Sequence, residues 1–84
     1  MKKYVLELVY IGDNSISTII TDINNGCSRE EIWIKNEDDK WGWENGWTST
    51  GMFNGLYQIL NGNDERTDEM LNEVSKIGTI TFSI

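Results

Sequence analysis

The spacing of apolar residues changes twice along this chain of 84 residues, and this change limits the possible folds more than any other feature. Up to about residue 44, β-branched and aromatic residues follow the period of two that is typical of strands. Residues 52–76 follow helical spacing, and residues 79–84 alternate again. This order predicts an α+β fold in one domain, residues 1–84: a mostly antiparallel sheet of three or four strands plus a C-terminal strand, with two helices on one face.

Two strands are expected in the first part of the chain. The first covers residues 4–11, and its core-facing side chains share one parity and are all apolar or amphipathic: Tyr4, Leu6, Leu8 and Tyr10. A turn at residues 12–15 leads into the second strand, residues 16–23. The following Asn24-Asn25-Gly26 predicts a tight turn, because asparagine and glycine tolerate a positive φ.

Residues 31–35 and 40–44 are expected to pair as a hairpin around a loop of about four residues, 36–39. In this register Ile32 and Ile34 share one face with two tryptophans of the returning strand, so that the apolar side of the hairpin is continuous. Trp33 then lies on the opposite face, where we expect its ring to be exposed.

A first helix is expected from six apolar residues at helical spacing: Met52, Phe53, Leu56, Tyr57, Ile59 and Leu60. Thr48, Ser49 or Thr50 is suited to cap its start, and Gly62 stands where a helix ends.

A second helix is expected from about Asp64 to Lys76, and Gly78 breaks it. Its apolar side is expected to consist of Met70, Leu71, Val74 and Ile77. Its opposite side carries acidic residues at spacings of three and four: Glu65, Asp68, Glu69 and Glu73.

The net charge of −7 is concentrated in one half of the chain. Residues 36–73 hold nine acidic residues against two basic ones, whereas residues 1–35 sum to −1. A one-sided negative field repels nucleic acid and attracts basic surfaces. We therefore expect a protein partner with a positive groove and no direct binding of nucleic acid.

The acidic residues have two interpretations, a solvated face that maintains solubility or a binding surface. Selection for stability alone would tend to intersperse lysines, because like charges four residues apart on a helix repel each other. Two acidic clusters together would imitate a line of phosphates. On the binding interpretation, the residues expected to contact a partner are Glu37, Asp38, Asp39, Glu44, Glu65, Asp68, Glu69 and Glu73.

Residues 41–47 hold three of the four tryptophans and also have two interpretations. They form a hairpin that covers the core, or they anchor an interface, since tryptophan is enriched at binding hot spots. Trp33 and Trp47 are the tryptophans that we expect to be exposed and to contact a partner.

Little in the sequence indicates enzymatic activity or metal binding. The chain has no histidine, the commonest general base and metal ligand. Residues 36–47 resemble a calcium-binding loop superficially, but tryptophan replaces the required glycine and glutamate at Trp41 and Trp47. We expect no enzymatic activity, no cofactor and no metal site.

The expected location is the cytoplasm. Cys27 is the only cysteine, so a disulfide within the chain is impossible and a reducing compartment fits. No apolar run approaches the roughly 18 residues of a membrane span. Glu7 interrupts the apolar stretch that a signal peptide would need.

Several short stretches have counterparts in a known family. They are residues 13–16 leading into Ile19-Ile20, residues 23–26, and residues 78–81 with the acidic stretch before them. In these stretches and in its order of elements, the chain resembles a type II-A Cas9 inhibitor family of phage anti-CRISPR proteins. The likeness touches much of residues 4–84. That family has a helix before the sheet, whereas this chain begins with a strand, and residues 41–47 look like an insertion.

The resemblance implies inhibition of a Cas9-type effector by DNA mimicry in a host bacterial cell. Such enzymes read a short DNA motif with arginines and hold nucleic acid in positive channels. The acidic residues listed above would pair with these arginines and lysines, and Trp33 and Trp47 would add apolar contacts. The competing class is a non-enzymatic interaction module, such as an immunity protein, an antitoxin or another phage anti-defence protein, which docks through exposed tryptophans.

Overall fold

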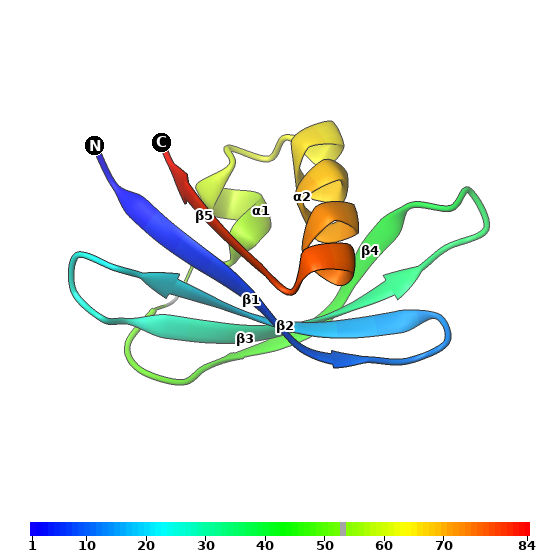
Figure 1. Cartoon of the computed structure of the whole chain (residues 1–84), viewed down its shortest axis with the longest axis horizontal. Helices are drawn as coiled ribbons and strands as arrows, with labels where there is room; N and C mark the ends of the chain where they lie inside the picture. The colour runs from blue at the N-terminus through cyan, green and yellow to red at the C-terminus, as the bar shows by residue number, and fades with distance from the viewer. Residues whose placement is uncertain (53) are drawn as a thin grey trace.

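Five antiparallel strands form one sheet in the computed structural model, which describes residues 1–52 and 54–84. The strands are β1 (Lys3–Ile11), β2 (Ser15–Asp22), β3 (Ser28–Lys35), β4 (Trp41–Thr48) and β5 (Thr79–Ser83), in the spatial order β4-β3-β2-β1-β5. The first four strands run up and down through short turns. The chain then passes through α1 (Leu56–Ile59) and α2 (Asp64–Ile77) before β5 pairs with β1 (Figure 1).

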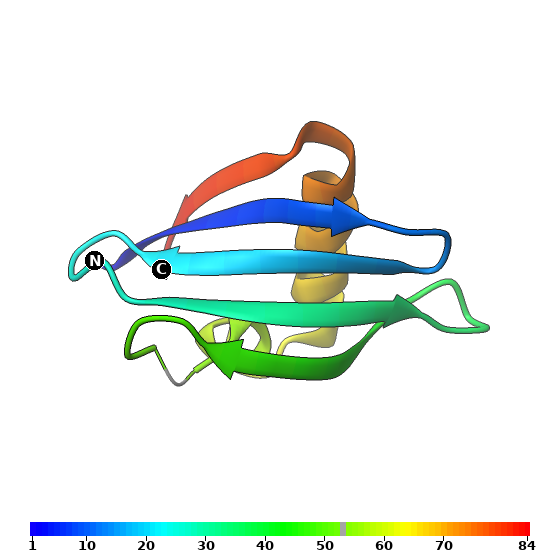
Figure 2. The same ribbon diagram turned by 90° about the horizontal axis from the view of Figure 1, so that it is seen from below.

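Both helices lie over the same face of the sheet, and the other face is uncovered (Figures 1 and 2). The α+β architecture predicted from the sequence is therefore confirmed. The core lies between this face and the helices, and its most buried apolar members are Leu6, Ile16, Ile20, Trp33, Leu56, Met70, Leu71 and Val74. Within the described residues, no helix is both long enough and apolar enough to cross a membrane.

The first strand follows the expected parity only in its first half. Tyr4 and Leu6 are buried and Leu8 is half-buried, as predicted. Tyr10 is exposed, contrary to the prediction. The register shifts between Leu8 and Tyr10, so Val9 is an extra residue in β1. A bulge of this kind re-aims the side chains that follow it.

The pairing of β3 with β4 differs by one residue from the predicted register. The backbone N–H of Asn36 donates to the carbonyl of Lys40 (2.8 Å), so the turn holds residues 37–39 rather than 36–39. Asp39 has a φ of 62°, which a three-residue hairpin turn requires at its last position. Because side chains alternate along a strand, a shift of one residue in the pairing changes which residues of β3 share a face with the tryptophans of β4.

The consequence is that Trp33, not Ile32 or Ile34, points into the core. Trp33 pairs with Trp43 on the helix-covered side, and Ile34 pairs with Gly42. β4 also continues beyond residue 44 to Thr48. The pairing of β3 with β4 contains an irregularity between Ile32 and Trp33, where the register of the two strands shifts. Residues 41–47 are thus an edge strand of the sheet.

The first helix is shorter than predicted. It begins after Gly55, whereas the three residues expected to cap it lie in β4 and the turn that follows: Thr48, Ser49 and Thr50. Met52, Leu56, Ile59 and Leu60 are buried as expected, but Tyr57 is exposed. Phe53, which the prediction placed in this helix, lies outside the described residues.

The second helix has nearly the predicted bounds. The side chain of Asn63 accepts a hydrogen bond from the backbone N–H of Arg66 (3.0 Å) and caps the start of α2. Gly78, with a φ of 91°, ends the helix in the left-handed conformation. Met70, Leu71 and Val74 are buried, but Ile77, in the last turn, is exposed rather than part of the core.

Candidate functional site

Seven of the eight acidic residues expected to contact a partner have exposed side chains. They are Glu37, Asp38 and Asp39 in the β3–β4 turn, Glu44 in β4, and Glu65, Glu69 and Glu73 on α2. The three on α2 follow one another at intervals of four residues, which is about 6 Å along the helix axis. We call these seven residues the acidic surface.

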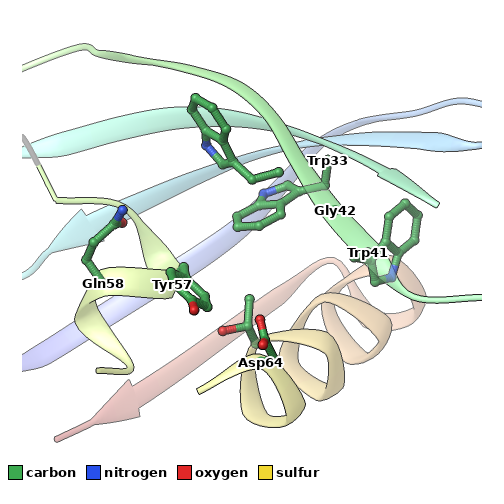
Figure 3. A pocket seen from close by; sticks show the side chains of 8 residues that line it. Trp33, Trp41, Gly42, Tyr57, Gln58 and Asp64 are labelled. Atoms are coloured by element: carbon green, nitrogen blue, oxygen red, sulfur yellow. The ribbon is translucent and has the colours of Figure 1, made fainter. Parts of the chain in front are cut away.

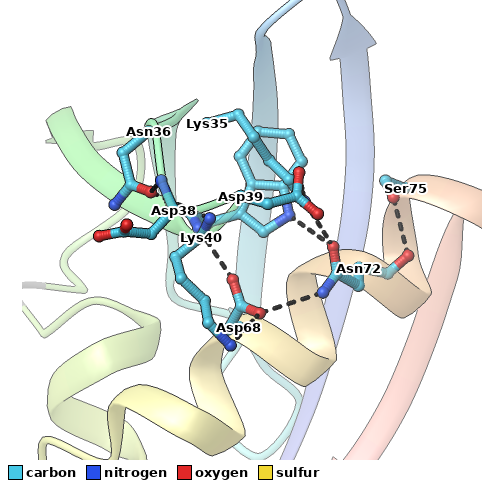
Figure 4. A network of polar contacts seen from close by, with 9 residues as sticks. Lys35, Asn36, Asp38, Asp39, Lys40, Asp68, Asn72 and Ser75 are labelled. Carbon is cyan, nitrogen blue, oxygen red and sulfur yellow. Dashed lines mark hydrogen bonds and ion pairs between the residues drawn. The ribbon is translucent and has the colours of Figure 1, made fainter.

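Asp68 is the exception, because it holds the β3–β4 hairpin against α2. Its Oδ1 accepts a hydrogen bond from the backbone N–H of Trp41 (2.8 Å), and its Oδ2 accepts one from Asn72 Nδ2 (3.1 Å) (Figure 4). Lys40 Nζ lies 3.8 Å from Asp68 Oδ2, and only 12% of the Asp68 side chain is exposed. This carboxylate is therefore mostly buried and bonded within the protein, and its expected contact with a partner stays a prediction.

The same contacts bring the two acidic clusters together. Asn72 Oδ1 accepts hydrogen bonds from Lys35 Nζ (2.9 Å) and from Trp41 Nε1 (3.0 Å). The Lys35 ammonium also lies 4.5 Å from the centre of the Trp41 ring, a cation–π contact, and 3.8 Å from Asp39. The turn that carries Glu37–Asp39 is thus fastened beside the middle of α2 (Figure 4).

Trp33 and Trp47, the two tryptophans expected at an interface, have opposite environments. Trp33 is 2% exposed, and its Nε1–H donates to Thr18 Oγ1 (3.0 Å) within the core. The prediction that Trp33 is exposed is therefore wrong, because it followed from the wrong hairpin register. Trp47 is 43% exposed. It pairs with Glu30 and lies on the uncovered face of the sheet, as strand alternation requires.

Trp43 is 53% exposed, the most of the four tryptophans, yet the sequence did not single it out. Its ring lines a cavity of about 310 Å³ between β4 and the two helices. Figure 3 shows Trp41 and Gly42 on β4, with Tyr57 and Gln58 of α1 and Asp64 of α2 across the cavity. Trp33 and Thr67 complete the lining. We call this cavity the aromatic pocket.

A buried carboxylate beneath the start of α1 orients part of this pocket. Glu31 is 2% exposed; its Oε2 accepts a hydrogen bond from Trp43 Nε1 (2.8 Å), and its Oε1 accepts one from the backbone N–H of Leu56 (2.8 Å). Arg29 Nε lies 3.8 Å from Oε2. Burial raises the pKa of Glu31, although the bonds from Leu56 and Trp43 and the charge of Arg29 oppose this shift.

The approach of Glu31 to α1 depends on Gly55. A Cβ atom at Gly55 would lie 2.6 Å from both Glu31 Oε1 and Cδ, distances that real side chains do not show. This contact could not be predicted from local residue patterns, because Glu31 follows another glutamate in a strand whose register had first to be known.

In residues 1–52 and 54–84, no three His, Cys, Asp or Glu side chains gather closely enough to hold a metal ion. Cys27 is half-buried and packs against the core. Compared with known proteins, the chain matches no family model, no curated protein and no solved structure.

Proposed function

We propose that this protein is a non-enzymatic inhibitor that binds a basic nucleic-acid-binding surface and acts as a DNA mimic. The expected target is a CRISPR-Cas effector of the Cas9 type, whose binding of target DNA the protein would block. On this proposal the protein acts in the cytoplasm of a host bacterial cell, without a cofactor and without binding nucleic acid itself.

The observation that carries the proposal is the joined acidic surface of α2 and the β3–β4 turn. Glu65, Glu69 and Glu73 form a row along the exposed side of α2, and the contacts of Asp68 and Asn72 bring the acidic turn alongside. Arginines and lysines that hold phosphates also form strong hydrogen bonds with carboxylates. A row of carboxylates along a helix can therefore occupy a channel built for a nucleic-acid backbone.

Few internal bases neutralise this surface. Among the described residues, its ion pairs are Lys35 with Asp39 (3.8 Å) and Arg66 with Glu69 (3.9 Å), and in both pairs the carboxylate is largely exposed. Exposed ion pairs of this kind contribute little to the stability of a protein. The carboxylates thus remain accessible to the bases of a partner.

The test is a target-DNA binding and cleavage assay with a panel of guide-loaded CRISPR effectors at two salt concentrations. We expect the protein to reduce DNA binding by at least one effector, and we expect salt to weaken this effect because the attraction is electrostatic. The variant E69K/E73K should inhibit at least about tenfold less well, since each reversal replaces an attractive contact by a repulsive one.

The matched control is E7K/D13K, which changes the net charge equally at exposed positions in β1 and the β1–β2 turn. This control should inhibit nearly as well as the parent protein. Equal inhibition by E69K/E73K and the parent would contradict DNA mimicry by α2, and no effect on any effector would remove the proposed target.

The exposure of Trp43 and Trp47 supports a second candidate, an interaction module that docks through tryptophans. Here the binding energy would come from apolar burial, so that salt would change the affinity little. A pull-down from host lysate followed by binding at two salt concentrations separates the two functions. Salt-insensitive binding that W47A abolishes would favour the module.

A further inference from the structure

The aromatic pocket is lined by aromatic rings, and the indole N–H groups of these rings already have partners within the protein. The indole N–H groups of its three tryptophans all donate within the protein: Trp33 to Thr18, Trp41 to Asn72 and Trp43 to Glu31. These bonds hold the rings in place without help from a ligand. The face of an indole ring carries negative electrostatic potential and attracts cations.

The polar groups of the pocket also favour a cation over an anion. Asp64 is the one charged residue that lines it, and its side chain is exposed at the start of α2. Among the described residues, no arginine or lysine lies within 4 Å of the Asp64 carboxylate. Thr67 already donates its hydroxyl to the carbonyl of Asn63 (2.7 Å). An anion would meet the Asp64 carboxylate and aromatic rings here.

We propose that the aromatic pocket binds an organic cation, a guanidinium or alkylammonium group. Its charge would lie over the exposed rings of Trp43 and Tyr57, and the Asp64 carboxylate would be its counter-ion. The protein already contains one contact of this chemistry, since the Lys35 ammonium lies 4.5 Å from the centre of the Trp41 ring. The volume of about 310 Å³ suits one small head group or one basic side chain.

This binding does not depend on the acidic surface or on inhibition of a CRISPR effector. It requires only the free protein, because β4, α1 and α2 form the pocket within a single chain. The cation has two possible sources, a small quaternary ammonium compound or an arginine side chain of a protein, and both share the chemistry that the pocket recognises.

The test is a titration of the ¹⁵N-labelled protein followed through its four indole N–H resonances. The probes are N-acetylarginine N-methylamide and choline, each to about 10 mM. Their neutral counterparts are N-acetylcitrulline N-methylamide and 3,3-dimethylbutan-1-ol. We expect the resonance of Trp43 to shift with at least one cation and with neither neutral compound, while that of Trp47, outside the pocket, stays in place.

Two variants assign the effect to the pocket. D64N should weaken cation binding about 2- to 5-fold, as expected for one exposed counter-ion. E73Q, which removes an equal charge elsewhere on α2, should leave it unchanged. The spectrum of D64N also reports its fold, because the Trp33 indole resonance depends on the buried bond to Thr18.

A response to choline alone would identify a small quaternary ammonium compound as the ligand, and a response to the arginine compound alone would identify a basic side chain. Equal shifts with the neutral compounds, an unchanged affinity in D64N, or no shift of Trp43 with either cation would each overturn the proposal. None of these results bears on the effector assay, so the two proposals fail separately.

Discussion

Glu31 illustrates how one side chain connects three parts of the molecule. It lies in β3, accepts hydrogen bonds from Trp43 in β4 and from the first residue of α1, and faces Arg29. A buried charge is costly unless it is paired and hydrogen-bonded, and here the distance to Arg29 Nε is 3.8 Å. Arg29 Nε itself has no hydrogen-bond partner among the described residues. The raised pKa of Glu31 follows from this incomplete compensation of burial.

This raised pKa predicts a specific pH dependence of stability. The folded state holds the proton of Glu31 more tightly than the unfolded chain, whose pKa is near 4.5. The stabilisation from the protonated form is fully present below pH 4.5 and is lost as pH rises through the folded-state pKa. Urea unfolding of the parent and E31Q should therefore show that their difference in unfolding free energy shrinks as pH rises above 4.5.

At neutral pH we expect E31Q to lower the free energy of unfolding by about 1–3 kcal/mol. In the variant, the amide nitrogen of glutamine would face one of the two N–H groups that donate to the carboxylate in the parent protein. E37Q serves as the control, since Glu37 is exposed in the β3–β4 turn. A difference between parent and E31Q that stays constant or grows with pH would contradict the assigned shift.

The β3–β4 hairpin is attached to α2 by polar contacts as well as by apolar packing. Asp68 and Asn72, one turn apart on α2, together accept hydrogen bonds from the Trp41 backbone, the Trp41 indole and Lys35. These contacts connect elements that are 27 to 37 residues apart in sequence. They give the edge strand β4 a partner on its helix-covered side and keep the acidic turn beside α2.

Replacement of Asp68 should loosen this attachment. D68A leaves the Trp41 N–H without its acceptor, and we expect a loss of about 1–3 kcal/mol in unfolding free energy. Hydrogen exchange should show faster exchange at the Trp41 amide than in the parent. E69A, at an exposed neighbouring position, should change the unfolding free energy by no more than about 0.5 kcal/mol. Equal effects of the two variants would show that Asp68 has no role in docking the hairpin.

The whole molecule carries a net charge of −7 on 84 residues, and most of the exposed acidic residues lie on α2 and the adjoining turn. Such a field suits association with a basic surface, but it also opposes the compact state through self-repulsion. The same carboxylates therefore lower the stability of the folded protein and support its proposed function.

Salt should raise the thermal stability of this protein. Between about 10 and 150 mM NaCl the screening length falls from about 30 to about 8 Å, which weakens the repulsion among the acidic residues. We expect the Tm to rise by a few degrees, because about 1 kcal/mol corresponds to about 4–8 °C for a domain of this size. Circular dichroism on heating measures this change.

The increase in Tm with salt should be smaller in E69K/E73K than in E7K/D13K, although both variants have the same net charge. This order is expected because Glu69 and Glu73 stand among other carboxylates, whereas Glu7 and Asp13 lie outside the acidic surface. A Tm that does not depend on salt would show that the repulsion is negligible in the folded protein.

Local residue patterns were enough to predict the class of the fold and most of its elements. Alternation defined the strands, the stripe of Met70, Leu71 and Val74 defined α2, and Gly78 marked its end. These features depend on neighbours within a few residues, so they can be derived without knowledge of distant contacts. The exposed acidic surface followed in the same way, because a charged side chain without a buried partner remains in water.

The aromatic pocket and the buried acid depended on contacts between distant parts of the chain. The choice between a turn of residues 37–39 and one of residues 36–39 shifts the β3–β4 register by one residue, and this shift decides whether Trp33 is buried or exposed. Asp68 and Glu31 look like ordinary acidic residues in the sequence, yet their partners lie 27 and 25 residues away. Only the packing of β4, α1 and α2 against one another places Trp43, Tyr57 and Asp64 around one cavity, because strand register and helix position are set by the whole core.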